Sequence, residues 1–216
     1  RDNGVGFLFD TKGQMLFSKS EVDKASLLGL LNSKVAYYFL GALSPTLDFN
    51  GGIVSRLPLK SCHKSISIST QRLVSTSRQD WDSNETAWDF TSLPLLHTDF
   101  RQPTLKASYQ KLRAHWREMT LEMQWLEVEN NRIFIDLYGL HYELTPEVPL
   151  DEITLTCNPH YQYGNNKSEE ELEVLLLADT MRDLVSYAVG CMFGRYALDK
   201  PGLIIANQGE TIEDYL

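Results

Sequence analysis

The sequence predicts an α+β fold that is mainly α, with small β hairpins near its start followed by a helical region. Three observations lead to this prediction. Apolar residues recur at alternating steps of four and three through residues 104–140, the pattern of a long coiled-coil-like helix. Short apolar runs joined by turn residues precede this helix, and a second stretch with a helical apolar face follows it at 168–194.

The first hairpin is expected from two short Phe-containing runs, Val5–Phe9 and Gln14–Ser18. The connecting residues begin with Asp10 and end with Gly13, an order that suits a type I turn. One helix is then expected over 23–43, where apolar residues repeat at helical spacing.

A second hairpin is predicted by Thr46–Phe49 and Ile53–Leu59, which flank Asn50-Gly51-Gly52, because Asn-Gly is the strongest short hairpin signal. No Lys-Ser/Thr follows these glycines, so a phosphate-binding P-loop is excluded. The Ser- and Thr-rich stretch 61–77 is interpreted as a linker that runs into a short helix. After it, Trp81 and Trp88 are interpreted as packing anchors.

The long helix is expected from Thr104 to about Tyr138, about 50 Å at 1.5 Å per residue. Its apolar face is interrupted once, by Asn130, and a buried Asn in such a position fixes the register of packing. A second helix is expected from Ser168 to Gly194, because Ser168 and Glu171 have the spacing of a capping box. The two helices are predicted to pair as an antiparallel, coiled-coil-like hairpin.

Composition limits the class of protein. The 216 residues are 43% hydrophobic and 23% charged, and they contain no apolar run long enough to span a membrane. Three cysteines without zinc-ligand spacing indicate reduced thiols and a cytoplasmic location. The net charge of −9 excludes a general basic coat for nucleic acid, although it permits a local basic surface. The start at Arg1 suggests a fragment of a longer polypeptide.

No pattern in the sequence indicates catalytic, cofactor-binding or metal-binding residues. The five histidines are scattered, and the nucleophile elbow and the dinucleotide fingerprint are absent. Asn158-Pro159-His160-Tyr161 is similar to the Asn-Pro-Pro-Tyr motif of amino-methyltransferases, but His160 replaces the second proline. These four residues are therefore predicted to form a structural turn.

Several longer strings carry a family resemblance. Residues 27–49 resemble the stretch that closes the target-recognition domain of large adenine-specific DNA methyltransferases. Further strings are similar to the PglX family, the methyltransferases of bacteriophage-exclusion (BREX) defence systems; these are Asp80–Phe90, Glu129–Ile135, Glu143–Leu150, Leu177–Asp183, Gly190–Tyr196 and Lys200–Gly202.

The resemblance implies that the catalytic motif and the S-adenosylmethionine pocket lie upstream, in the methyltransferase domain of the same polypeptide. Residues 1–60 would then end the target-recognition domain, 61–103 would be a linker with short helices, and 104–216 a helical C-terminal region. The implied function is to position double-stranded DNA for adenine-N6 methylation, with the target base flipped out of the helix.

The residues predicted to contact DNA are Lys34, Asn50, Arg56 and Lys60, which lie around the Asn-Gly turn and the adjoining helix. Lys and Arg hold phosphates or guanine edges, and Asn suits adenine. Two alternatives stay open. One is the C-terminal part of a type IIG-like restriction–modification enzyme, and the other is a module that docks other phage-defence proteins through the long helix without contacting DNA.

Overall fold

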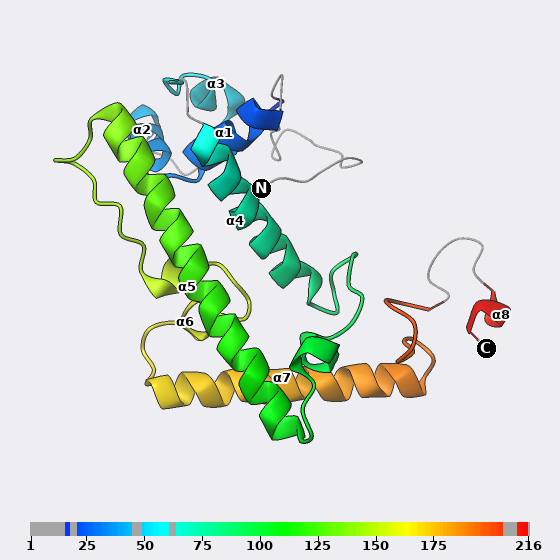
Figure 1. Ribbon diagram of the computed structural model, residues 1–216. Coiled ribbons are helices and arrows are strands. Elements are labelled where there is room, and N and C mark those ends of the chain that lie inside the picture. The colour runs from blue at the N-terminus through cyan, green and yellow to red at the C-terminus, as the bar shows by residue number, and fades with distance from the viewer. Residues whose placement is uncertain (1–15, 18–20, 45–48, 61–63, 205–210, 216) are drawn as a thin grey trace. The chain divides into compact units, whose positions relative to one another are not determined.

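The described part of the chain consists of helices and the loops that connect them. The computed structural model describes residues 16–17, 21–44, 49–60, 64–204 and 211–215 (Figure 1). Its α helices are α1 (Glu21–Leu31), α2 (Lys34–Leu43), α3 (Gly51–Val54), α4 (Lys64–Asp82), α5 (Leu105–Tyr138), α6 (Pro159–Tyr163), α7 (Glu169–Met192) and α8 (Ile212–Tyr215). The described residues also form three short 3-10 helices, Pro94–Leu96, Thr98–Phe100 and Leu150–Glu152. Within these ranges there is no β strand, so the predicted α+β class is wrong.

The two predicted hairpins have different outcomes. The first, at 5–18, lies outside the described residues except for Leu16 and Phe17, which belong to neither helix nor strand. The second is replaced by α3. Asn50 is the N-cap of this helix, and its side chain accepts a hydrogen bond of 3.1 Å from the backbone N–H of Ile53. Asn is favoured both in tight turns and at N-caps, and here the second preference prevails.

The helix expected over 23–43 is divided in two at Asn32 and Ser33. Asn32 donates its side-chain amide to the carbonyl of Leu28 at the end of α1. Ser33 is the N-cap of α2, and its hydroxyl accepts from the backbone N–H of Ala36 at 3.3 Å. Each side chain forms a hydrogen bond with a backbone group at a helix end. In a continuous helix these backbone groups would bond to each other instead.

Residues 64–82 form one helix, α4, where a linker was predicted. Its buried positions are Ile66, Ser67, Thr70 and Asp80. Ser and Thr are poor helix formers, but helix propensity is a weak preference that tertiary packing overrides. The sequence predicted a linker running into a short helix over 61–77, and the structure has instead one helix of 19 residues.

The described residues form two compact units, and α4 and α5 contribute to both. The first unit contains the residues up to Ser75 together with Glu122–Pro149. Its core consists of Leu30, Val35, Ile66, Phe134 and Ile135. Asn130 and Asn131 join α5 to the first two helices, because Asn130 donates to the carbonyl of Gly29 and Asn131 accepts from the backbone N–H of Lys34.

The second unit contains Thr76–Leu121 and Leu150–Leu216. One cluster packs the ring of Phe90 against Tyr187 and Tyr196, and these two tyrosines stack with their ring centroids 4.8 Å apart. Another cluster surrounds Leu112, which is fully buried and is packed by residues of α7.

The predicted hairpin of two long helices is not formed. In the second unit α7 crosses the N-terminal half of α5 (Figure 1). Arg113 and Arg117 of α5 contact Glu173 there, while Tyr109 and Leu112 pack near Met181 and Leu184. The C-terminal half of α5 packs instead in the core of the first unit. The apolar face of α5 is therefore shared between different neighbours, although the helix itself and the capping box of α7 are confirmed.

Candidate functional site

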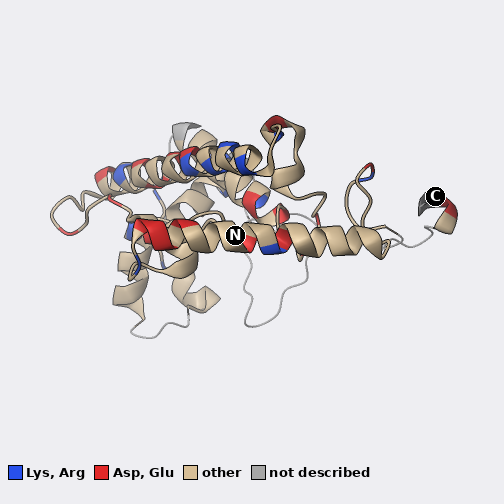
Figure 2. Cartoon of the chain, turned by 90° about the horizontal axis from the view of Figure 1, so that it is seen from below, with Lys and Arg blue, Asp and Glu red and all other residues tan. Residues whose placement is uncertain are grey.

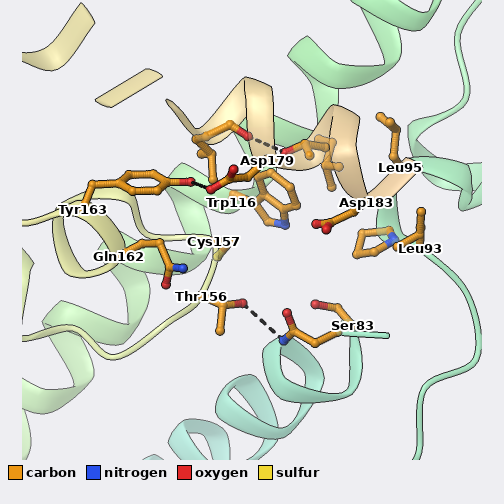
Figure 3. A pocket seen from close by; sticks show the side chains of 15 residues that line it. Ser83, Leu93, Leu95, Trp116, Thr156, Cys157, Gln162, Tyr163, Asp179 and Asp183 are labelled. Carbon is orange, nitrogen blue, oxygen red and sulfur yellow. Dashed lines mark hydrogen bonds between the residues drawn. The ribbon is translucent and has the colours of Figure 1, made fainter. Parts of the chain in front are cut away.

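The second unit contains a small polar cavity of about 110 Å³ (Figure 3). Asp179 and Asp183 line it from α7, and Trp116 lines it from α5. The opposite side is formed by the end of α4 and by the segment 156–163, with Ser83, Asn84, Thr156, Cys157, Gln162 and Tyr163. Leu93, Pro94 and Leu95 also line it, so the cavity collects side chains from five stretches of the chain.

Asp80 holds the cavity wall in place. Its buried carboxylate accepts hydrogen bonds from the backbone N–H of Thr156 at 2.7 Å, from the Thr156 hydroxyl at 3.0 Å and from the backbone N–H of Cys157 at 3.2 Å. These bonds tie the end of α4 to the loop before α6. Hydrogen bonds to an ionised group are stronger than neutral ones, so this attachment fixes the loop firmly.

Asn158 shapes the next turn of the same loop. It is completely buried and is the N-cap of α6, where its Oδ1 accepts from the backbone N–H of His160. Its Nδ2 donates to the carbonyls of Leu150 and Ile153 at 2.7 and 2.8 Å. Every side-chain atom that could grip a base is therefore occupied by the protein's own backbone, which supports the predicted structural turn at 158–161.

Burial shifts the pKa values of three cavity groups, Tyr163, Asp183 and Cys157, towards their neutral forms. The Tyr163 hydroxyl donates to Asp179 at 2.6 Å, and burial together with this carboxylate raises the pKa of Tyr163. Burial and the negative charges of Asp179 and Glu85 raise the pKa of Asp183. Burial and then the nearby Asp80 raise the pKa of the Cys157 thiol, so this cysteine stays protonated and is a poor nucleophile.

The cavity is small, and its described lining contains no histidine. Pockets for drug-sized ligands measure roughly 300–1,000 Å³, so this cavity is too small to hold S-adenosylmethionine. The Ser83 hydroxyl donates to the carbonyl of Asp80, and no histidine among the described residues lines the cavity to act as its base. In the same described ranges no cluster of His, Cys, Asp and Glu could hold a metal ion.

The four residues predicted to contact DNA lie in the first unit, and three of them have partners there. The Lys34 ammonium donates to the carbonyl of Glu147. The Lys60 ammonium donates to the carbonyl of Leu137 at 2.7 Å and lies 4.9 Å from the ring centroid of Tyr138. Asn50 uses its Oδ1 to cap α3.

Arg56 differs from the other three. It lies just after α3 with an exposed side chain, and within the described ranges its guanidinium makes no hydrogen bond or ion pair. Its guanidinium is therefore available to an external anion.

The sequence-based prediction of cationic contacts did not include three other exposed basic residues, Arg101, Lys106 and Lys111. They lie in the second unit, at and just before the start of α5. The sequence contained a signal for these residues, namely an excess of positive charge: residues 100–117 include basic residues but no acidic residue.

The described residues form a helical protein with a small polar cavity in its second unit. Its sequence is homologous over nearly its whole length to part of two adenine-specific methyltransferases, which confirms the predicted resemblance to PglX. It is 37% identical over 214 residues to the adenine-specific methyltransferase PglX of Lacticaseibacillus casei (strain Zhang), a match that covers 95% of this chain and 16% of PglX. It is 31% identical over 207 residues to the adenine-specific methyltransferase BrxX of Escherichia coli O9:H4 (strain HS), covering 94% of this chain and 17% of BrxX.

The chain thus spans about a sixth of the length of these relatives. No model of a known protein family matches the sequence. In the part of the chain that the structure describes, none of the helices has the length and apolar character needed to cross a membrane.

Proposed function

We propose that this chain is part of a site-specific DNA adenine-N6 methyltransferase of a BREX-type phage-defence system, acting in the cytoplasm. Its role is to position duplex DNA. The catalytic residues and S-adenosylmethionine belong to another part of the same polypeptide. The observation that carries the proposal is the match to two adenine-specific methyltransferases over 95% and 94% of the chain.

The DNA contacts are proposed at Lys34, Asn50, Arg56 and Lys60. Arg56 has a free guanidinium, which suits a phosphate or the edge of a guanine. Lys34 uses one donor on a carbonyl, and an ammonium group has three donors, so its further N–H groups can reach phosphates. Lys60 is proposed for its positive charge alone. The Asn50 amide nitrogen can donate to DNA while its oxygen caps α3.

The test uses the full-length polypeptide that carries this chain, with each of the four residues changed to Ala in turn. DNA affinity is measured over a range of salt concentrations, and methyl transfer from S-adenosylmethionine to adenine is measured on the same DNA. Loss of a phosphate contact lowers the slope of log affinity against log salt by about one, whereas loss of a base contact relaxes sequence preference. We expect the first result for Arg56→Ala.

Lys167→Ala is the control, because Lys167 lies in the second unit and donates to the carbonyl of Tyr163. If all four Ala variants bind and methylate DNA as the wild type does, the DNA surface lies elsewhere. If the wild-type polypeptide transfers no methyl group to duplex DNA, the proposed function is wrong.

A second candidate function is a module that docks other phage-defence proteins through the long helix. Leu121 and Trp125, four residues apart on α5, are 57% and 59% exposed, and exposed apolar side chains on one helix face favour a protein partner. The double variant Leu121→Ser/Trp125→Ser separates the two functions. Docking predicts that the full-length variant methylates DNA normally but fails to restrict phage.

A further inference from the structure

The N-terminal half of α5 and the residues just before it carry an unbalanced positive charge. Between residues 100 and 117 the chain has five basic residues and no acidic residue, in a protein with a net charge of −9. These residues are Arg101, Lys106, Lys111, Arg113 and Arg117. Figure 2 shows the same separation of charge along α5, with Lys and Arg towards one end and most Asp and Glu towards the other.

Two of the five share a single carboxylate. Arg113 donates to both oxygens of Glu173, at 2.9 Å from Nε and 2.7 Å from Nη2, and its side chain is only 11% exposed. Arg117 donates to the same Glu173 at 2.7 Å, yet its side chain stays 60% exposed. Two positive charges are therefore met by one negative charge, and Arg117 remains accessible from solvent.

The other three have no partner within the described ranges. Arg101, Lys106 and Lys111 are exposed and form no hydrogen bond or ion pair there through their charged groups. Three other helical arginines do have such partners, since Arg72 pairs with Glu122, Arg132 with Glu129 and Arg182 with Asp179.

Local helix energetics give no reason for these cations. The first turn of α5 contains no acidic residue, although the positive end of a helix dipole favours acids and disfavours Lys106. The residues three and four positions from Lys106 and Lys111 include no Asp or Glu that could form a helical ion pair. The nearest acids along the chain are Asp99, which faces His97 at 3.4 Å, and Glu118. Residues that break a local rule without an evident structural gain point to a function.

We infer that a basic surface around the start of α5, made of the exposed Arg101, Lys106, Lys111 and Arg117 on more than one side of the helix, binds the phosphate backbone of duplex DNA. The inference rests on the proposed function, and it adds a contact in the second unit to those proposed in the first. Two of the three partner-free side chains are lysines, compact point charges that suit phosphate rather than the forked recognition of a base. The surface therefore contributes affinity that does not depend on DNA sequence.

The experiment compares the full-length wild-type polypeptide with the triple variant Arg101→Gln/Lys106→Gln/Lys111→Gln. Binding to duplexes with and without the methylated sequence is measured between about 50 and 200 mM salt. Each lost phosphate contact removes about 0.9 from the slope of log affinity against log salt, so the slope falls by about 2–3 on both duplexes. The sequence preference of methylation stays as in the wild type.

A control variant removes the same number of charges elsewhere. Arg78→Gln/Arg132→Gln/Lys167→Gln changes three exposed cations outside residues 100–117, and its salt slope is expected to match that of the wild type. The charge-conserving variant Lys106→Arg/Lys111→Arg should also keep the wild-type slope.

The outcomes separate the inference from the proposed function. If the wild type binds DNA and the triple variant keeps the wild-type slope, the basic surface is wrong and the proposed function stands. The surface is equally wrong if the control variant lowers the slope as much as the triple variant does. If the wild type does not bind duplex DNA, the proposed function fails, and this inference fails with it.

Discussion

The side-chain amide of Asn130 on α5 donates a hydrogen bond of 2.9 Å to the backbone carbonyl of Gly29 on α1. Asn130 is buried. The Gly29 carbonyl of α1 therefore has a hydrogen-bond donor from another helix. The absence of a side chain at Gly29 lets the two helices approach closely. A Cβ placed there would lie 2.8 Å from Thr70 Oγ1 and 2.9 Å from Asn130 Oδ1. The residue that interrupts the apolar sequence pattern of the long helix thus marks a close helix contact.

Asn130→Ala should destabilise the first unit by about 1–3 kcal/mol, because it removes a buried hydrogen bond and leaves a cavity. Urea unfolding measures the change. Asn165→Ala is the matched control, since Asn165 is exposed and its partner Asp151 can turn to water, so a change within about 0.5 kcal/mol is expected. Equal effects of the two substitutions would contradict a special role for Asn130.

Gly29→Ala and Gly41→Ala should change stability in opposite directions. At Gly29 the new methyl group meets Thr70 and Asn130, and overpacking of this kind costs about 1–3 kcal/mol. At Gly41 in α2 the new methyl group meets nothing within 4 Å, so the better helix propensity of Ala gains up to about 1 kcal/mol. Thermal unfolding of the two variants gives the comparison.

A second substitution tests the cause of the Gly29→Ala effect. The Thr70 hydroxyl is buried and has no hydrogen-bond partner among the described residues. Thr70→Ala should therefore recover part of the stability lost in Gly29→Ala, because it removes one of the two clashing atoms. Strict additivity of the two changes would show that the methyl group and the hydroxyl do not meet.

The sequence predicted those elements whose signals are local. The apolar periodicity of α5 and the Ser168–Glu171 capping box of α7 are complete within a short stretch, and both helices are present. The Asn50-Gly51 signal failed because the same residues suit a hairpin and a helix N-cap. Helical periodicity predicts which face of a helix is buried but not which element packs against it. For this reason the predicted pairing of α5 with α7 along their lengths was wrong.

The cavity could not be predicted, because its wall depends on contacts between distant residues. Asp80 and Thr156 are 76 positions apart, and nothing in either local sequence indicates their hydrogen bonds. Trp88 shows the same limit, since it was interpreted as a packing anchor but is 96% exposed, while the neighbouring Phe90 is buried. Residue type and spacing do not determine which aromatic side chain faces the core.

Glu173→Gln should destabilise the second unit at pH 7, by about 2–4 kcal/mol, because it removes the charge that Arg113 and Arg117 share. The hydrogen bond from Arg113 and then that from Arg117 lower the pKa of Glu173 below its ordinary value of 4.5, although burial opposes them. A carboxyl with a lowered folded pKa stabilises the protein above its unfolded pKa, and this stability is lost as the pH falls through the folded pKa.

The difference in unfolding free energy between wild type and Glu173→Gln should therefore be constant near neutral pH and shrink below about pH 4.5. Glu129→Gln is the control, because its partner Arg132 is 51% exposed and exposed pairs contribute about 0–1 kcal/mol. A difference for Glu173→Gln that does not change with pH would exclude the lowered pKa as its source.

Asn158→Ala in the full-length polypeptide should lower stability and leave methylation within a few-fold of the wild type per folded molecule. The substitution leaves the buried carbonyls of Leu150 and Ile153 without their donor and removes the N-cap of α6, a combined cost of about 2–4 kcal/mol. Asn158→Asp keeps the cap acceptor but sets a carboxylate against the same two carbonyls, so it should be at least as destabilising. The measurements are the unfolding temperature and the rate of methyl transfer at a temperature where each variant stays folded. A loss of methylation with an unchanged unfolding temperature would instead assign Asn158 to the reaction.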